Sequence, residues 1–319
     1  INPNHIEALS NLGVIYLEHL HFKEAVEVFQ KLINIAPEYP GVGKNLEVAR
    51  KQLKINKIKL EYSDYINKFS GEDSIYDENH LIVSYLDLLK KCLTDTLHLN
   101  HQSEEYILAR EGLDCPLKAE TMIGIKRLNN LHYCISQVIK NNTPGDLIET
   151  GIWRGGATIF MRGILKAYGI TDRTVWAADS FEGIPPPNET TYPYDKNSPL
   201  HKVDILKVSL QEVQENFKKY NLLDEQVIFL KGLFKDTLPS APIKNLAVLR
   251  LDGDLYESTM DALLNLYHKL SPGGYIIIDD FEAIFSCKKA VEDFRKDNKI
   301  KEKIERIDHS GIYWQKLGL

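Results

Sequence analysis

Short apolar runs alternate with stretches of helical periodicity between residues 146 and 297, and few architectures accommodate such an alternation. The runs with the composition of strands lie at 147–148, 174–178, 227–230, 246–251 and 275–278. Helical patterns cover about 258–270 and 284–297. Apolar strands separated by helices are typical of a parallel sheet with helices on both faces. The sequence therefore predicts an α/β fold that binds its ligand beyond the carboxyl ends of the strands.

The first run leads into a glycine-rich turn, Glu149-Thr-Gly-Ile-Trp-Arg-Gly-Gly156, and then into a helical pattern. Glycine leaves room where a ligand approaches the backbone, and the start of a helix offers N–H groups. The turn is not the dinucleotide motif G-x-G-x-x-G, because Trp153 stands at its second glycine, and no Gly-Lys-Ser/Thr follows as in a phosphate-binding loop. The pattern E-x-G-x-x-x-G resembles the first motif of S-adenosylmethionine (SAM)-dependent methyltransferases. A glycine turn without a ligand is the alternative.

Asp179 ends the second run and lies 28 residues after Gly151. A carboxylate in this place can accept hydrogen bonds from both ribose hydroxyls of an adenine nucleoside. NAD and SAM share that requirement, so Asp179 indicates a nucleoside without choosing between the two. The alternative is an acid that only caps the next turn.

Two later strands also end in acids, one at Asp252 and one at the pair Asp279-Asp280. The 27 positions from Asp252 to Asp279 hold one helix and one strand, so neighbouring strands would bring these carboxylates together. Clustered carboxylates repel one another unless a proton or a cation lies among them, and oxygen ligands suit Mg²⁺ or Ca²⁺. The alternative is helix capping, by Asp254 and Ser258 for one helix and by Asp280 for the next.

A long irregular insertion, residues 182–204, follows the nucleoside acid. Loops of this length in compact domains are often lids or binding loops. Tyr192 and Tyr194 are candidates to stack on a sugar or an aromatic substrate. His201 is a candidate general base, with an ordinary surface histidine as the alternative.

Residues 4–37 have the spacing of a tetratricopeptide repeat, which is a pair of helices about 34 residues long. The positions of large and small residues in that repeat are filled by Leu9, Leu12, Gly13, Tyr16, Ala25, Phe29 and Pro37. The pattern predicts antiparallel helices at about 4–19 and 22–35, with an ordinary helical hairpin as the alternative. The pattern of a second repeat is incomplete, and one long polar helix is predicted there instead, at about 43–69. Because a single repeat cannot bury its own faces, we expect further repeats upstream and a protein partner for this segment.

A polar stretch, residues 70–74, separates this helical segment, residues 1–70, from a second domain, residues 71–319. The second domain is predicted to begin with a helical part, 71–145, before the α/β core, 146–319. In the helical part, residues 100–120 look loop-like, and Thr121 is predicted to cap a helix that begins at Met122.

The net charge of −6 gives little electrostatic support to a nucleic-acid partner. The four cysteines are scattered without a C-x-x-C pair, which argues against a zinc site or a disulfide framework and fits a reducing cytoplasm. No apolar run reaches the roughly 18 residues of a membrane helix, and no signal peptide is recognisable. The first residue is Ile1, so we expect the chain to be part of a longer one.

Six phrases of the sequence, together spanning roughly 80–316, resemble the macrocin O-methyltransferase family. They are Met122-Ile-Gly-Ile-Lys-Arg-Leu-Asn-Asn-Leu131, Asp146-Leu-Ile-Glu-Thr-Gly-Ile-Trp-Arg-Gly-Gly156, Ala178-Asp-Ser-Phe-Glu-Gly-Ile-Pro-Pro-Pro187, Gly232-Leu-Phe-Lys-Asp-Thr-Leu-Pro239, Arg250-Leu-Asp-Gly-Asp-Leu-Tyr-Glu-Ser-Thr259 and Gly274-Tyr-Ile-Ile-Ile-Asp-Asp-Phe281. The resemblance implies a Rossmann-like class I methyltransferase with a mostly parallel seven-stranded sheet. It also implies methylation of deoxysugar hydroxyls of antibiotics with SAM and Mg²⁺.

Positions carried over from that family give a candidate site. The metal ligands would be Asp252, Asp279 and Asp280, with Asp252 also catalytic. The cofactor would be bound by Thr121, Met122, Glu149, Thr150, Gly151, Trp153, Arg154, Gly155, Asp179, Ser180, Phe181, Gly232 and Phe234. His201 falls where the family has a histidine near the substrate.

The sequence thus predicts a cytoplasmic SAM- and Mg²⁺-dependent O-methyltransferase acting on a hydroxyl of a sugar or a glycosylated natural product. The acceptor hydroxyl would lose its proton to His201 or to a carboxylate of the metal site and then attack the sulfonium methyl group. Two alternatives remain open: a catechol or another phenol as acceptor, or a tetratricopeptide adaptor whose methyltransferase domain is inactive. A homodimer is expected by analogy with the family, and neither a nucleic acid nor a membrane is expected as a partner.

Overall fold

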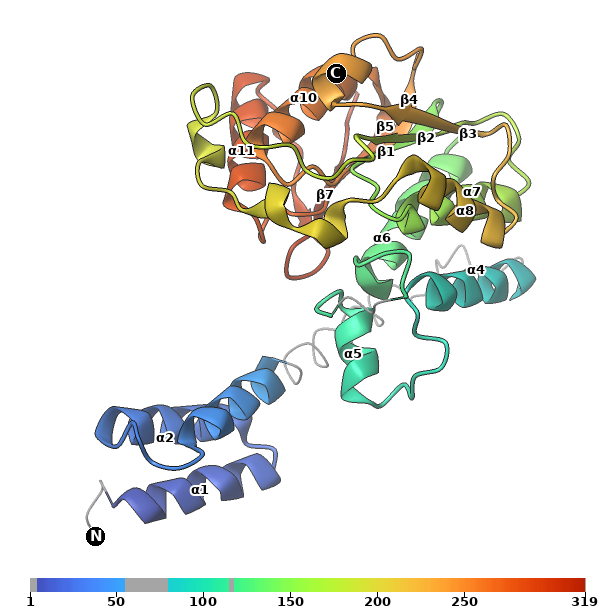
Figure 1. Ribbon diagram of the computed structural model, residues 1–319. Coiled ribbons are helices and arrows are strands. Elements are labelled where there is room, and N and C mark those ends of the chain that lie inside the picture. The colour runs from blue at the N-terminus through green and yellow to red at the C-terminus, as the bar shows by residue number, and fades with distance from the viewer. Residues whose placement is uncertain (1–4, 55–79, 115–117, 319) are drawn as a thin grey trace. The chain divides into compact units, whose positions relative to one another are not determined.

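The computed structural model describes residues 5–54, 80–114 and 118–318, and the chain divides into two compact units, residues 1–74 and 75–319 (Figure 1). The predicted domain boundary after residue 70 lies outside the described residues. In the described part of the chain, no helix combines the length and the apolar character that crossing a membrane requires.

The first unit contains a helical hairpin, α1 (Ile6–Glu18) and α2 (Phe22–Ile35), followed by a helix over residues 42–54. Gly13 allows the two helices to approach, because a Cβ atom there would lie 2.6 Å from the ring of Phe29. Ala25, Phe29 and Leu32 of α2 are fully buried in this small core. The two predicted helices are therefore present, while residues 55–69 of the long polar helix lie outside the described residues.

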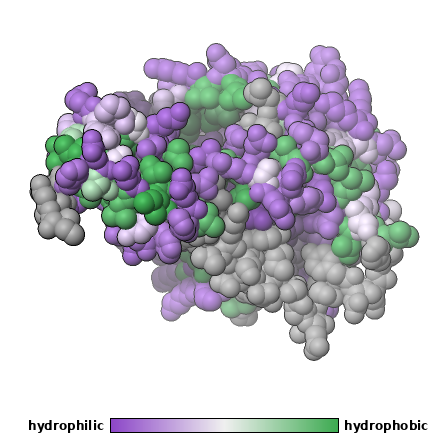
Figure 2. Space-filling view, turned by 90° about the horizontal axis from the view of Figure 1, so that it is seen from below, coloured by the Kyte–Doolittle hydropathy of each residue, from purple (hydrophilic) through white to green (hydrophobic). Residues whose placement is uncertain are grey.

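Some apolar side chains of the first unit remain at the surface. Leu12 and Ile15 of α1 are 38% and 49% exposed. The face of the molecule in Figure 2 shows small hydrophobic patches among hydrophilic residues. A short hairpin does not have enough neighbouring chain to bury both sides of its helices.

The second unit is built on one seven-stranded sheet in the order β3-β2-β1-β4-β5-β7-β6. Its strands are β1 (Asp146–Thr150), β2 (Val175–Asp179), β3 (Val227–Lys231), β4 (Leu246–Leu251), β5 (Leu270–Ile278), β6 (Glu305–Arg306) and β7 (Ile312–Gln315). Strands β1 to β5 pair in parallel, and β7 is antiparallel to both β5 and β6. The predicted mostly parallel seven-stranded sheet is confirmed.

Helices cover both faces of this sheet (Figure 1). One face packs against α4 (His80–Leu93), α6 (Gly124–Lys140), α7 (Gly156–Ala167) and α8 (Leu210–Lys219). The other face packs against α10 (Tyr256–Leu266) and α11 (Phe285–Asp297). Successive strand residues point to opposite faces, so Leu147 belongs to the first core and Ile148 to the second. Because helices cover both faces of the sheet, a ligand can reach the sheet at the ends of its strands.

The structure corrects two predictions in the helical part. Residues 100–120 are not entirely loop, because α5 (Glu104–Arg110) forms there with Ser103 as its N-cap. Thr121 does not cap a helix at Met122, because α6 begins at Gly124. Gly124 has a φ of +72°, and such a left-handed residue cannot continue a helical turn from the residues before it.

Candidate active site

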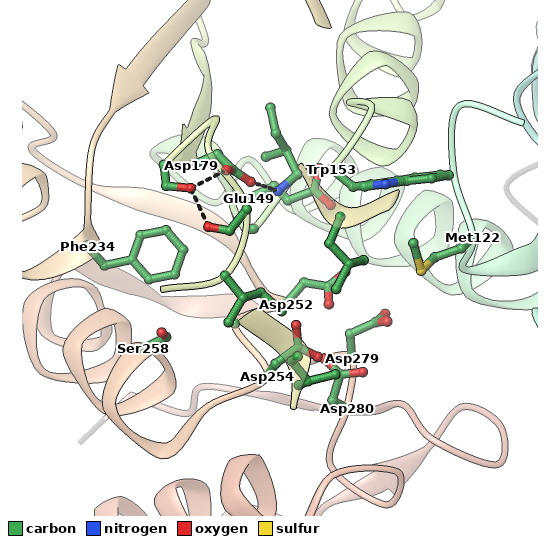
Figure 3. Close-up of a pocket in the computed structure, with 18 of the residues that line it drawn as sticks. Met122, Glu149, Trp153, Asp179, Phe234, Asp252, Asp254, Ser258, Asp279 and Asp280 are labelled. Carbon is green, nitrogen blue, oxygen red and sulfur yellow. Dashed lines mark hydrogen bonds between the residues drawn. The ribbon is translucent and has the colours of Figure 1, made fainter. Parts of the chain in front are cut away.

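The glycine-rich turn joins β1 to α7 and brings its backbone against the end of β4 (Figure 3). Gly151 has a φ of +80°, and a Cβ atom there would lie 1.7 Å from the carbonyl oxygen of Asp252. Gly155, with a φ of +86°, is the N-cap of α7. Only glycine fits at position 151, so these residues fix how close the ends of β1 and β4 come.

Glu149 lies buried at the end of β1, below this turn. Thr158 of α7 donates a hydrogen bond to its carboxylate, and Arg250 forms an ion pair with it. Burial raises the pKa of Glu149 to about 7, although Arg250 and Thr158 favour the ionised form.

Asp179 ends β2, and its carboxylate holds the glycine-rich turn (Figure 3). It accepts hydrogen bonds from the backbone N–H groups of Ile152, at 2.8 Å, and Phe181, at 2.7 Å. Burial raises its pKa, and these backbone bonds oppose the rise. The predicted nucleoside acid thus lies beside the predicted cofactor turn, oriented by the backbone.

Three carboxylates gather below the turn (Figure 3). Asp252, Asp254 and Asp280 each offer an oxygen, and these oxygens lie within 4.8 Å of one another. One oxygen of Asp280, Oδ2, is buried and has no hydrogen-bond partner. Burial raises the pKa of Asp280 well above its usual range, and burial with the charge of Asp252 raises the pKa of Asp254 to about 7. Such a group of oxygens matches the ligands of a hard divalent cation.

Asp279, predicted as a metal ligand, is held by arginines in this structure. Its Oδ2 pairs with Arg127, and its Oδ1 pairs with Arg250. Arg250 also contacts Asp252 at 2.9 Å, and Arg127 contacts Asp308 at 2.7 Å. The two guanidinium groups thus connect Glu149 at the end of β1, the carboxylates after β4 and β5, and the turn before β7.

A cavity of about 810 Å³ contains these groups. The predicted residues that line it are Thr121, Met122, Glu149, Gly151, Trp153, Asp179, Ser180, Gly232, Phe234, Asp252, Asp279 and Asp280. In Figure 3, Phe234 and Ser258 lie on one side of the acids, and Trp153 and Met122 lie on the other.

Five predicted residues are not among those that line the cavity: Thr150, Arg154, Gly155, Phe181 and His201. Phe181 packs against Phe229, and Arg154 donates to the carbonyl oxygen of Ala119 at 3.0 Å. The Nδ1 atom of His201 lies 3.1 Å from the carbonyl oxygen of Ser198, within its own loop.

The insertion after β2 is fixed at its centre. Asp195 is buried and accepts hydrogen bonds from the first N–H groups of α10, those of Tyr256 at 2.7 Å and Glu257 at 3.0 Å. Tyr194 packs its ring against Tyr256, at 5.3 Å between centroids, instead of lining the cavity. The alternative to a metal site required Asp254 or Ser258 to cap α10 with its side chain. Neither residue does so.

The two arms of the insertion form a wall of the cavity. Ile184, Pro185, Pro186 and Leu200 of the insertion contribute apolar surface, and so does Leu206 just after it. The indole N–H of Trp153 donates to the carbonyl oxygen of Ile205 at 2.7 Å and so joins the segment after the insertion to the glycine-rich turn. The insertion is therefore fixed at its centre, and residues on either side of that centre line the cavity.

Sequence reasoning missed Arg127, Arg250, Asp308 and His309. Arg250 interrupts an otherwise apolar strand, and this was a usable sign of a buried ion pair. Asp308 and His309 belong to the turn before β7, a four-residue strand that the apolar pattern did not reveal. His309 lines the cavity, unlike His201.

The parallel sheet of this order, the glycine turn after β1 and the acid after β2 define a Rossmann-like SAM-dependent methyltransferase. Residues 97–316 match the family described as Macrocin-O-methyltransferase (TylF). The chain therefore belongs to this family, and it is a SAM-dependent O-methyltransferase.

Individual relatives agree with this assignment. The demethyldecarbamoylnovobiocin O-methyltransferase of Streptomyces niveus is 53% identical over 243 residues, which are 73% of this chain and 93% of that protein. The mycinamicin III 3''-O-methyltransferase of Micromonospora griseorubida is 49% identical over 244 residues, which are 73% of this chain and 96% of that protein. The structure of the O-methyltransferase NovP superposes with a TM-score of 0.71 at 53% identity, covering 74% of this chain and all of NovP.

Proposed function

We propose that this enzyme methylates a hydroxyl of a sugar in a glycosylated natural product and uses Mg²⁺ to do so. The observation that carries the proposal is the group of carboxylates that shares one cavity with the cofactor turn. The named relatives methylate glycosylated compounds, which supports a glycoside as the acceptor class.

The donor set fits Mg²⁺. Asp252 and Asp280 belong both to the predicted ligand set and to the group of close oxygens, and Asp254 supplies a third oxygen. The partnerless Oδ2 of Asp280 is a buried polar atom that a cation would satisfy. Asp279 remains a predicted ligand, and it would have to leave at least one of its arginines to bind a cation.

The electrostatics of the cavity favour an acceptor without phosphate groups. Nine carboxylates line it, but only two cationic side chains do so among the described residues, Arg127 and Lys235. Arg127 is paired with Asp279 and Asp308, and Lys235 lies 3.3 Å from Glu257. The lining side chains themselves therefore offer a diphosphate little electrostatic attraction, whereas a neutral glycoside needs none.

The chain's own residues have separable tasks in this reaction. The backbone of the glycine-rich turn holds the cofactor, and Asp179 accepts hydrogen bonds from its ribose. Asp252 and Asp280 would hold the cation beside the acceptor. When bound, SAM would supply the methyl group and Mg²⁺ would make the acceptor hydroxyl more acidic. The proton would pass to a carboxylate of the cluster, because His201 does not line the cavity, and the apolar residues of the insertion would exclude water.

Calorimetry and turnover test this proposal together. SAM is titrated into the protein with Mg²⁺ and with EDTA, and methyl transfer to demethyldecarbamoylnovobiocin, mycinamicin III and catechol is followed by mass spectrometry. We expect SAM to bind in both buffers and a glycoside to be methylated only with Mg²⁺. Methylation of catechol alone would replace the glycoside with the phenol alternative, and no SAM binding would refute the active enzyme.

The variant Asp252→Asn separates the cation site from the cofactor site. It should abolish turnover and change the Kd for SAM by less than about threefold, because the amide keeps the shape but not the charge. Asp204→Asn, at a fully exposed position, is the matched control and should behave like the wild type. Full turnover by Asp252→Asn would contradict the metal role.

Three finer points belong to the same proposal: a homodimer, a cytoplasmic location and a tetratricopeptide-like role for α1 and α2 in binding a protein. The packing of Gly13 against Phe29 supports the repeat, since that repeat requires a small residue there. Sedimentation velocity tests the dimer, and a single species at the monomer mass would exclude it.

A further inference from the structure

The turn before β7 is rigidly held beside the carboxylate cluster. The Oδ1 atom of Asp308 accepts hydrogen bonds from the backbone N–H groups of Ser310, at 2.9 Å, and Gly311, at 2.7 Å. Ser310 donates its hydroxyl to the carbonyl oxygen of Asp279 at 2.7 Å and accepts the N–H of Glu282 through its own carbonyl at 3.0 Å. The turn is therefore bonded to the segment that carries the cluster's acids.

His309 sits at the centre of this turn and faces the cavity. Its side chain is 37% exposed, and its Nδ1 lies 4.0 Å from Oδ2 of Asp308. Among the described residues that line the cavity, it is the only histidine. Asp279, Asp280 and Ala283 also line the cavity, and Ser310, the residue after His309, donates its hydroxyl to the carbonyl oxygen of Asp279. The turn that carries His309 is therefore adjacent to the segment that carries the acids.

The order of the strands places His309 on the acceptor side. Asp179 ends β2, and β1, β4 and β5 lie between β2 and β7 in the sheet. Four strand spacings of about 4.8 Å put roughly 19 Å between the nucleoside acid and the turn before β7. The carboxylate cluster follows β4 and β5, and it therefore lies between the two. A nucleoside bound at Asp179 leaves the space beside His309 to the acceptor.

We propose that His309 binds the acceptor and helps to determine which acceptor is used, and this rests on the proposed function above. A neutral imidazole has one hydrogen-bond donor and one acceptor, which suits a sugar hydroxyl. Its flat ring also gives apolar contact to the glycoside. The bonds of Asp308 and Ser310 fix the turn before the acceptor arrives, so binding does not have to order it.

Two substitutions and one control test the role. His309→Phe keeps a ring but removes the hydrogen bond, and His309→Gln keeps a donor and an acceptor. His201→Phe makes the same change at the histidine that does not line the cavity. The measurements are KM and kcat with demethyldecarbamoylnovobiocin and mycinamicin III, the Kd of S-adenosylhomocysteine, and calorimetric binding of each glycoside to the protein saturated with S-adenosylhomocysteine.

For His309→Phe we expect KM and the glycoside Kd to rise about 5- to 10-fold, the loss expected for one hydrogen bond between neutral groups. The kcat should stay within about threefold, and the affinity for S-adenosylhomocysteine should not change. His309→Gln should recover most of the loss, and His201→Phe should resemble the wild type. The unchanged affinity for S-adenosylhomocysteine also shows that the variants are folded.

Three results would overturn the role of His309. They are an unchanged KM in His309→Phe, a fall in kcat with constant KM, and a glycoside Kd that depends on His201 instead. If neither glycoside binds the wild-type complex, the inference is wrong for this acceptor class. Failure of the proposed function is a different result, because glycosides would then bind without being methylated or SAM itself would not bind.

Discussion

Replacing Arg250 with methionine tests the charge network under the cofactor turn. Arg250 is 1% exposed and pairs with Glu149, Asp252 and Asp279, so its loss leaves buried carboxylates without their shared cation. Removing one partner of a buried ion pair costs about 3–5 kcal/mol. We expect Arg250→Met to lose about this much free energy of unfolding at pH 8.

The cost should depend on pH through Glu149. Its pKa in the folded protein, about 7, exceeds its ordinary value of 4.5, so the stability that its proton provides is complete below about pH 4.5 and is lost as pH rises through 7. This difference of 2.5 units corresponds to about 3 kcal/mol. Without Arg250 the pKa rises further, and the variant keeps a proton that the wild type releases between pH 7 and 8. Because the wild type has released half of this proton by pH 7, the destabilisation should be about 1 kcal/mol larger at pH 8 than at pH 7.

Urea unfolding of the wild type and Arg250→Met at pH 6, 7 and 8 measures both quantities. Glu149→Gln and the double variant complete a cycle, and the double variant should lose the dependence on pH that comes from Glu149. Arg250→Lys keeps the charge and should recover part of the stability. A loss below about 1 kcal/mol, or the same loss at all three pH values, would refute the network as described.

Further substitutions test the parts that hold the site. Asp195→Ala removes the acceptor for two N–H groups of α10 and should lower the free energy of unfolding by about 1–2 kcal/mol. In a thermal melt this corresponds to a Tm lower by about 2–8 °C. An unchanged Tm would contradict the capping role of Asp195. Gly151→Ala should abolish binding of S-adenosylhomocysteine in calorimetry, because its Cβ would overlap the carbonyl of Asp252, whereas Gly169→Ala, with nothing within 4 Å, should bind normally. Trp153→Phe removes the bond to Ile205 and should cost about 1 kcal/mol in urea unfolding, and equal stability would show that the bond contributes nothing.

The acids at the strand ends were predictable because parallel strands end at one edge of a sheet. Asp252 and Asp280 follow β4 and β5, which are neighbours, and the pattern alone indicated that they meet. Asp254 was considered only as a helix cap, in the alternative to a metal site. The cap comes instead from Asp195, which lies 61 positions before Tyr256, and no local pattern predicts a partner at such a distance.

Neither Arg127 nor the last two strands could be predicted from the local sequence. Arg127 pairs with Asp308 across 181 positions, and each residue alone looks like an ordinary charged residue. Strands β6 and β7 have only two and four residues, too few for a periodic pattern to stand out. Tyr192 and Tyr194 were predicted to stack on a substrate because they are aromatic, but Tyr194 packs on Tyr256 in a loop fixed by Asp195.

The sheet also determines when the site can form during synthesis. Strand β7 is made last, yet it lies between β5 and β6. The turn before it carries Asp308, the partner of Arg127 in a helix translated more than 160 residues earlier. The nascent protein can therefore pair its first five strands and bury much of its core while Arg127 still lacks one of its carboxylates. A chain that ends before residue 308 would lack the turn that lines the cavity with His309 and Ser310, so its active-site cavity would stay incomplete.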